Sequence, residues 1–128
     1  MLKINSENVQ IMKRYIDYDR FEGVVNGKKK KCFVLYLTLI TSEFKLSIET
    51  NYDIEWIKSL KIDDKKDISK YIIGLPYEDK NGWMYLTNKC SCTICRIKDN
   101  QYQINLDGHF EECGEQLDIE YLDILDIK

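Results

Sequence analysis

The longest apolar run of the chain, residues 32–40, predicts the central strand of an antiparallel sheet. It reads Cys-Phe-Val-Leu-Tyr-Leu-Thr-Leu-Ile and is rich in residues that favour strands. Segments on both sides read as further strands, and turn residues follow at Asn26-Gly27 and Thr41-Ser42. The pattern therefore predicts an N-terminal three-strand meander.

The pair Asn26-Gly27 predicts the register of the first hairpin, because a type I′ turn needs positive φ at both central residues. A two-residue loop there places Glu22 opposite Lys31. At Thr41-Ser42, a two-residue loop and a four-residue loop give the same facing of side chains, since both keep the parity of the strand. Both hairpins select one core face on the central strand: Phe33, Leu35, Leu37 and Leu39.

After residue 50 the apolar spacing changes from two to three or four, which is typical of a helix. This spacing predicts a helix over 53–60 and a second helical segment over 67–73, which ends at Gly74. A turn-rich loop is expected over 77–82, and a short strand over 83–87.

The C-terminal part of the chain predicts a second hairpin around Asp99-Asn100. A two-residue loop pairs Cys95 with Ile104 on the core face and leaves Cys92 on the polar face. Residues 117–121 alternate strictly and predict a strand. The pattern of 122–128 fits a strand or a helix, of which we favour the strand, and the conformation of residues 1–13 stays open.

These elements predict an α+β fold in a single domain over residues 1–128. The sheet is mainly antiparallel, formed by the meander and by the C-terminal hairpin plus strand, with a short helical segment in the middle. Whether the strands form one sheet, a sandwich or a barrel is not decided by the pattern.

Composition and the number of cysteines indicate an ordered protein and the cellular compartment in which we expect it. The chain has 128 residues, 44% of them hydrophobic, and one Pro, which favours an ordered core over disorder. It has an odd number of cysteines, five, and no N-terminal segment of the signal-peptide type, so we expect reduced thiols in a cytoplasmic protein. The apolar run is about half the roughly 20 residues that a membrane span needs.

The charges are distributed unevenly. The net charge is −3, yet residues 99–127 carry nine acids and no Lys or Arg. Such a field steers association with a partner of opposite charge. The leading hypothesis is therefore a small non-enzymatic interaction module, such as an immunity-type inhibitor that binds a basic protein, for example a toxin nuclease. The residues expected at that interface are Asp107, Glu111, Glu112, Glu115, Asp118 and Glu120, with Tyr121 as an exposed aromatic anchor.

A cluster of thiols supplies the main alternative. Cys90, Cys92 and Cys95 are followed by the only histidine, His109, and by Cys113. Thiolates and imidazoles are zinc ligands, and a closed structural site needs four of them. The predicted register separates Cys95 from Cys90, so the zinc set would be Cys90, Cys92, His109 and Cys113. Against this stands the reading of these residues as ordinary buried or solvated thiols with no cofactor.

Two further hypotheses, a Cys–His hydrolase and a nucleic-acid-binding protein, have weaker support in the sequence. A Cys–His hydrolase would have to pair Cys90 with His109, with Asp107 to orient the ring, but the sequence lacks the motifs of common hydrolases and nucleotide-binding enzymes. The basic run Lys28–Lys31 could contact nucleic acid, but four Lys beside a turn are more typical of a solvated strand edge. The sequence does not define the oligomeric state.

Overall fold

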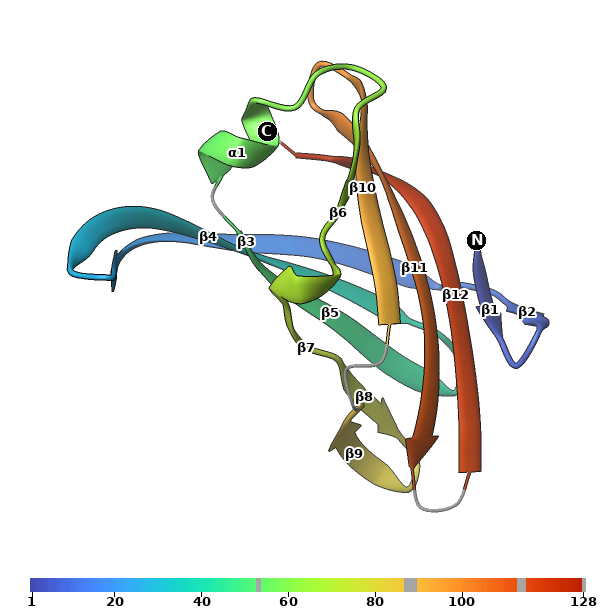
Figure 1. The fold of residues 1–128 in the computed structure, drawn as a ribbon. Helices are drawn as coiled ribbons and strands as arrows, with labels where there is room; N and C mark the ends of the chain where they lie inside the picture. Colours follow the sequence, from blue (N-terminus) through green and yellow to red (C-terminus); the bar gives the residue numbers. More distant parts are fainter. Residues whose placement is uncertain (53, 87–89, 113–114, 128) are drawn as a thin grey trace.

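The computed structural model describes residues 1–52, 54–86, 90–112 and 115–127 of the chain. Strands make up 70% of the chain and helical turns 6%. The strands form two antiparallel sheets that lie one in front of the other (Figure 1). The prediction of an α+β fold is therefore wrong, because the chain is mostly antiparallel β-structure.

The first sheet, which we call sheet A, contains both ends of the described chain. Its strand order is β2-β1-β12-β11-β10-β6. The strands are β1 (Leu2–Ile4), β2 (Glu7–Val9), β6 (Lys65–Asp67), β10 (Cys90–Lys98), β11 (Gln101–Glu112) and β12 (Glu115–Asp126).

The second sheet, sheet B, contains the predicted meander. Its strand order is β3-β4-β5-β8-β9, and the short strand β7 also pairs with β5. The strands are β3 (Lys13–Val25), β4 (Lys28–Ile40), β5 (Phe44–Tyr52), β7 (Ile72–Gly74), β8 (Pro76–Asp79) and β9 (Gly82–Tyr85).

The first hairpin has the predicted register. Glu22 lies opposite Lys31 and Ile16 lies opposite Leu37. Asn26 and Gly27 both have positive φ, 52° and 77°, as a type I′ turn requires. The far end of this hairpin extends beyond the rest of the molecule (Figure 1), and Lys28 and Lys29 are exposed there.

The second turn of the meander is the longer of the two variants considered. Ile40 lies opposite Lys45, so four residues connect the strands. The hydroxyl oxygen of Thr41 accepts a hydrogen bond from the backbone N–H of Phe44 at 3.1 Å, which closes the loop. The facing of the side chains is as predicted: Leu35, Leu37 and Leu39 are buried, whereas the side chain of Phe33 lies outside the described residues.

The second hairpin departs from the predicted register by one residue. Its pairing shifts between Arg96 and Lys98, which is the signature of a β-bulge. As a result Ile94 lies opposite Ile104, where Cys95 was expected. A shift of one residue turns every side chain of a strand to the other face. Cys92 is therefore fully buried in the core, and the predicted placement of Cys95 on the core face is wrong.

The predicted helical middle is reduced to short turns. Helix α1 covers only Ile54–Lys58, and the segment over 67–73 contains the end of β6, a single 3₁₀ turn at Ser69–Tyr71, and the start of β7. β6 pairs with β10, and β7 pairs with β5. These strand pairings at sheet margins outweigh the local helical spacing. Tyr77–Gly82, expected as a loop, contributes β8 and the start of β9.

The two ends of the chain meet on sheet A. Residues 1–13, left open by the sequence, supply β1 and β2, and Leu2 pairs with Tyr121. The N-terminal amine of Met1 donates a hydrogen bond to the carbonyl of Leu122 at 2.9 Å. Strand β12 continues to Asp126, so the preference for a strand over 122–126 is confirmed.

One hydrophobic core lies between the sheets. Sheet B contributes residues such as Leu37 and Leu46, and sheet A contributes Ile104 and Phe110. At its margin Arg14 of β3 forms an ion pair with Asp123 of β12, whose carboxylate also accepts a hydrogen bond from the hydroxyl of Tyr121 at 2.7 Å. This cluster ties the two sheets together.

Candidate binding face

Strands β11 and β12 gather carboxylates on the side of sheet A that faces away from the core. Side chains alternate along a strand, and the buried residues of β11 and β12 include Leu106, Phe110 and Ile119. The positions between them point outward. Asp126 lies at the far end of β12, opposite Gln101. We define the acidic face as the four described outward carboxylates at the other end of the strand pair: Asp107, Glu111, Asp118 and Glu120.

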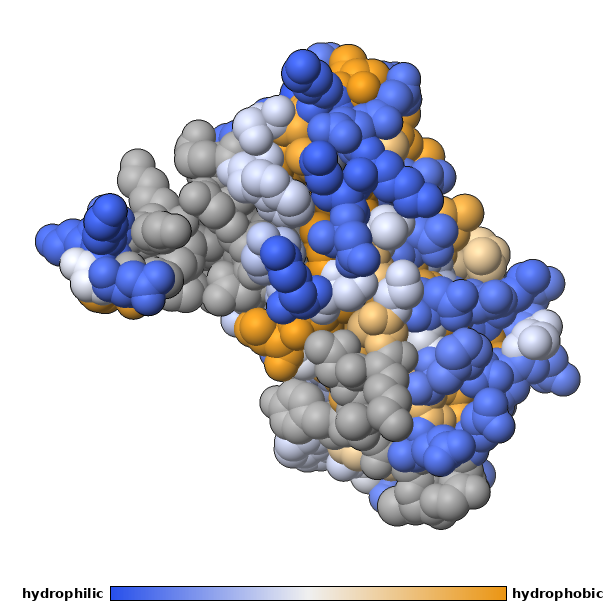
Figure 2. Space-filling view, in the orientation of Figure 1, coloured by the Kyte–Doolittle hydropathy of each residue, from blue (hydrophilic) through white to orange (hydrophobic). Residues whose placement is uncertain are grey.

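The register brings these carboxylates close together. Asp107 lies directly opposite Glu120 in the β11–β12 pairing. Directly opposite side chains have Cβ atoms about 5 Å apart, and like charges there destabilise a sheet. On the other side of Glu120 the β1 residue Lys3 is its direct neighbour. Figure 2 shows hydrophilic side chains at the lower right, where Figure 1 places β1, β2 and the lower parts of β11 and β12.

His109 lies within the acidic face. Its ring Nδ1 is 2.8 Å from Oδ1 of Asp118, directly across the strand pair, and its side chain is 74% exposed. The hydrogen bond to Asp118, with the charge of that carboxylate and of Asp107 and Glu120, raises the pKa of His109. The same bond, followed by one from Gln116, lowers the pKa of Asp118. Protonation of His109 therefore adds one positive charge to this face.

Asp118 is held from several directions. The side-chain amide of Gln116 donates to its carboxylate at 3.2 Å, and its backbone N–H donates to Oδ1 of Asn5 at 2.8 Å. Asn5 sits in the β1–β2 turn with φ of 50°. The N-terminal hairpin thus fixes the position of this carboxylate. Asp107, Glu111 and Glu120 lie around it as the other carboxylates of the face.

The other predicted interface residues are Glu112, Glu115 and Tyr121. Glu112 and Glu115 pair at the end of the hairpin, but their side chains lie outside the described residues. Tyr121 is fully buried, so its prediction as an exposed anchor is wrong. It follows Glu120 directly, and the alternation of a strand turns it toward the core. Burial, and then its hydrogen bond to Asp123, raise the pKa of its hydroxyl.

The proposed zinc ligands are divided between the two sides of sheet A. Cys90 lies opposite Gly108 and not opposite His109, and it packs against the core, as does Cys92. The ring of His109 points to the outer side. Cys113 lies outside the described residues. Since Cys90 and Cys92 do not approach His109, the zinc set stays a prediction without support from their placement.

Cys90 and Cys92 are poor nucleophiles. Burial, followed by the charge of Asp67, raises the pKa of Cys90 to about 11. Burial, followed by the neighbouring Cys90, raises the pKa of Cys92 to about 12. A reactive cysteine needs a lowered pKa, because the thiolate is the attacking species. This geometry gives a Cys90–His109 pair no support.

In the described ranges no three His, Cys, Asp or Glu side chains are grouped so that they could hold a metal ion. Nor does any described helix have the length and apolar character needed to cross a membrane.

Sequence reasoning missed the polar residues that support the face. Lys3 and Asn5 come from a segment whose conformation the pattern left open, and Gln116 carries no charge. The contact of β1 with β12 joins residues more than a hundred positions apart, as between Asn5 and Asp118. A local pattern contains no signal for such a pairing.

Comparisons of the chain with protein-family models, with curated proteins and with solved structures found no match.

Proposed function

We propose that the chain is a small, non-enzymatic binding module whose acidic face binds a basic protein surface. One observation carries this proposal: Asp107 and Glu120 lie directly opposite each other, with Glu111 and Asp118 on the same side of the sheet. Cationic side chains of a partner would relieve the repulsion between the two opposite carboxylates.

The arrangement suits recognition of an extended basic segment or a basic sheet surface. Outward residues along one strand repeat about every 7 Å, and those on neighbouring strands lie about 5 Å apart. Arg side chains bind carboxylates through two parallel hydrogen bonds, which would add geometric selection to the charge attraction. The carboxylates would then occupy the positions that phosphate groups take on a nucleic acid.

A basic toxin such as a nuclease is the partner class that we favour, with this chain as its immunity-type inhibitor. An inhibitor of that kind needs no catalytic group and gains speed of association from charge complementarity. The proposal includes a reducing cytoplasm as the place of action, in keeping with the free thiols of Cys90, Cys92 and Cys95.

The experiment is affinity capture of partners from a lysate of the source cells. The bait is compared with a neutralised variant that carries Asp107→Asn, Glu111→Gln, Asp118→Asn and Glu120→Gln. A matched control variant removes the same number of charges at exposed positions elsewhere: Glu7→Gln, Glu22→Gln, Glu43→Gln and Asp63→Asn. Circular dichroism melts establish that all three proteins are folded.

The proposal predicts a basic protein that is captured by the wild type and by the control variant and is lost with the neutralised variant. Capture should weaken as salt rises, because screening shortens the range of the field. Equal capture by the neutralised variant would overturn the proposal, and so would a captured partner with an acidic surface.

A further inference from the structure

The outer side of sheet B carries an ordered pattern that the acidic face does not explain. Its side chains alternate with the buried Leu37, Leu39 and Leu46 and therefore point away from the core. Across β3, β4 and β5 they form three rows: Lys13–Ile40–Lys45, then Tyr15–Thr38–Ser47, then Asp17–Tyr36–Glu49. A basic row and an acidic row thus flank a central row without charge.

The central row is suited to burial. Tyr15 is 50% exposed, which is high for an aromatic side chain on a sheet. The hydroxyl groups of Thr38 and Ser47 lie 3.1 Å apart and form a hydrogen bond, so one of the two O–H groups already has its acceptor when the row is covered. The small side chain of Thr38 leaves a hollow of about 500 Å³, lined by Tyr15, Ile16, Asp17, Tyr36, Thr38, Ile40 and Lys45.

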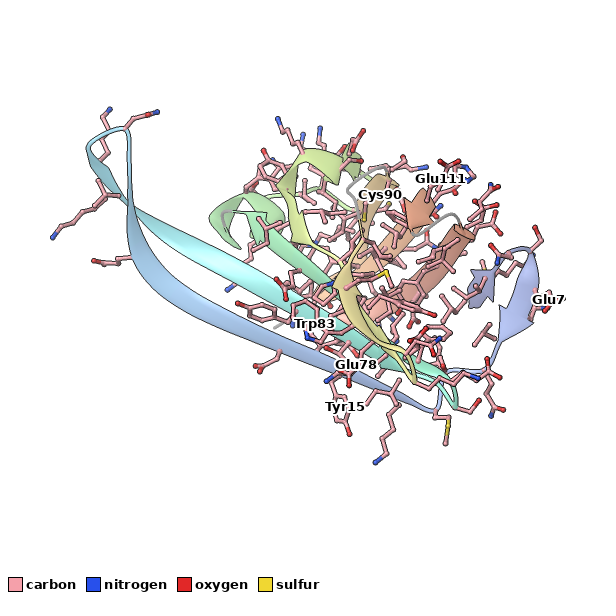
Figure 3. All side chains as sticks on the ribbon, turned by 90° about the horizontal axis from the view of Figure 1, so that it is seen from below. Glu7, Tyr15, Glu78, Trp83, Cys90 and Glu111 are labelled. Carbon is pink, nitrogen blue, oxygen red and sulfur yellow. The ribbon has the colours of Figure 1, made fainter. Side chains whose placement is uncertain are left out.

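The surface extends across the next strands. Lys45 lies opposite Glu78 of β8, and Glu78 lies opposite Trp83 of β9, which is 63% exposed. Figure 3 shows Tyr15, Glu78 and Trp83 on the same side of the molecule. Aromatic residues on an exposed surface are typical of protein interfaces.

We propose that this outer face of sheet B binds the same face of a second copy of the chain, forming a two-fold symmetric dimer. In such a dimer one patch meets itself, so each residue pair occurs twice. Stacked sheets lie about 10 Å apart, which is within reach of the side chains named here.

The charge pattern selects one orientation of the two copies. With the two-fold axis along the rows, strands of the two copies run antiparallel and the basic row covers the acidic row. Lys13 then faces Asp17 of the second copy, Lys45 faces Glu49, and Ile40 faces Tyr36. With the axis along the strands, Lys13 would face Lys45 and Asp17 would face Glu49, and like charges would repel. The first arrangement is the one that we infer.

Sedimentation velocity at low ionic strength tests the dimer with two charge-reversed proteins. One carries Lys13→Glu and Lys45→Glu, and the other carries Asp17→Lys and Glu49→Lys. The wild type should move from the chain mass of 15.3 kDa toward twice that mass as its concentration rises. Each reversed protein alone should show a dissociation constant raised at least about tenfold, and an equimolar mixture of the two should restore the dimer.

A control variant and a contact probe complete the test. Lys28→Glu with Lys29→Glu makes the same charge change at the exposed hairpin tip and should leave the dimer intact. Thr38→Arg fills the hollow and should abolish the dimer while the monomer stays folded, as circular dichroism can establish. A wild type that stays monomeric at millimolar concentration would overturn the proposal. So would a dimer that survives the charge reversals, or a mixture of the reversed proteins that stays monomeric. Since these substitutions leave sheet A unchanged, failure here is distinct from failure of the acidic face.

Discussion

Asp107 and Glu120 lie directly opposite each other on neighbouring strands of sheet A, with both carboxylates exposed. Most sheets avoid like charges at such positions, because the repulsion lowers stability. The chain keeps this arrangement and surrounds it with Glu111 and Asp118. Residues that bind partners commonly reduce the stability of the free protein, and the proposed function would give this pair such a role.

Removing one charge of this pair should therefore stabilise the free protein. We expect Asp107→Asn to increase the free energy of unfolding by about 0.5 kcal/mol, since it abolishes the repulsion from Glu120. Asp126→Asn is the matched control, because Asp126 lies opposite the uncharged Gln101. Urea denaturation of both variants at neutral pH measures the difference. A loss of stability in Asp107→Asn would show that the two carboxylates do not repel.

The hydrogen bond between His109 and Asp118 should raise the pKa of the His109 ring, and an NMR titration can measure this pKa. Since the chain has a single histidine, its ring signals in an NMR titration belong to His109. We expect a midpoint above the ordinary value near 6.5, and a return toward that value in Asp118→Asn. A raised folded pKa means that the stabilisation from this group is complete at low pH and is lost as pH rises through that pKa.

The charge of His109 should also affect binding of the partner, and this effect has the opposite pH dependence: binding should improve as pH rises. Below its pKa the imidazolium adds a positive charge to the acidic face, so association with a basic partner should be faster above that pKa than below it. His109→Gln should remove this pH dependence. If the dependence persists in His109→Gln, another group on the face controls it.

A glycine in β11 should be essential for core structure. A Cβ atom at Gly108 would lie 2.6 Å from the ring of Phe110, which is 1% exposed, and 3.2 Å from Cβ of Cys90. We expect Gly108→Ala to lower the free energy of unfolding by about 1–3 kcal/mol, as overpacked core variants do. Thermal and urea denaturation measure this loss.

A double-mutant cycle identifies the cause of that loss. Phe110→Leu alone should destabilise the fold because it leaves space in the core. In the Phe110→Leu background, however, Gly108→Ala should cost less than in the wild type. Strictly additive effects would mean that the alanine clashes with the strand backbone and not with the ring.

The ion pair of Arg14 and Asp123 should link the two sheets at neutral pH and be lost in acid. Burial raises the pKa of Asp123, but hydrogen bonds from Tyr121 and Arg14 outweigh it, so the pKa is lowered. A lowered folded pKa contributes stability above the unfolded value of 3.8, and this is lost as pH falls through the folded pKa. Asp123→Ala also deprives the Tyr121 hydroxyl of its acceptor, and we expect a cost of about 1–3 kcal/mol at neutral pH.

Stability measured against pH checks this account. The difference in unfolding free energy between wild type and Asp123→Ala should shrink as pH falls through the lowered pKa. Tyr121→Phe should reduce this pH dependence without abolishing it, because it removes the larger of the two side-chain hydrogen bonds to Asp123 while the bond from Arg14 remains. A difference that does not change with pH would contradict the ion pair.

The sequence predicts the parts of this fold in which a turn motif defines the register of a hairpin. Asn26-Gly27 fixed a register that the structure reproduces residue by residue, because few backbone turns accommodate that pair. The turn at Asp99-Asn100 gave a weaker signal. Both Ile94 and Cys95 can pair with an apolar residue, so the pattern of β10 fits either face. The bulge between Arg96 and Lys98 decides between them, and no residue type marks it in advance.

Long-range pairing explains the helical prediction that failed. Ile68 and Ile72 have helical spacing, and both are buried, but in the structure the chain between them leaves one sheet and joins the other. Asp67 accepts hydrogen bonds from the backbone N–H and the hydroxyl of Ser69, which turns the chain at that point. The pairing partners of β6 and β7 lie in distant strands, and local spacing contains no information about them.

The candidate site was predictable only as far as local alternation along a strand defines it. The alternation of 117–121 places Asp118 and Glu120 on one face, and it also places Tyr121 on the other, which the choice of an exposed anchor overlooked. The opposition of Asp107 and Glu120 depends on the turn between β11 and β12, and residues 113–114 within it gave no register signal.

The most direct test of the account is the rate of association between the chain and its captured basic partner, measured by stopped-flow at several salt concentrations. We expect the neutralised variant of Asp107, Glu111, Asp118 and Glu120 to associate much more slowly at low salt and to lose most of its salt dependence, while the control variant behaves like the wild type. Association rates that are equal for all three proteins at low salt would contradict it, and would show that the acidic face does not bind the partner.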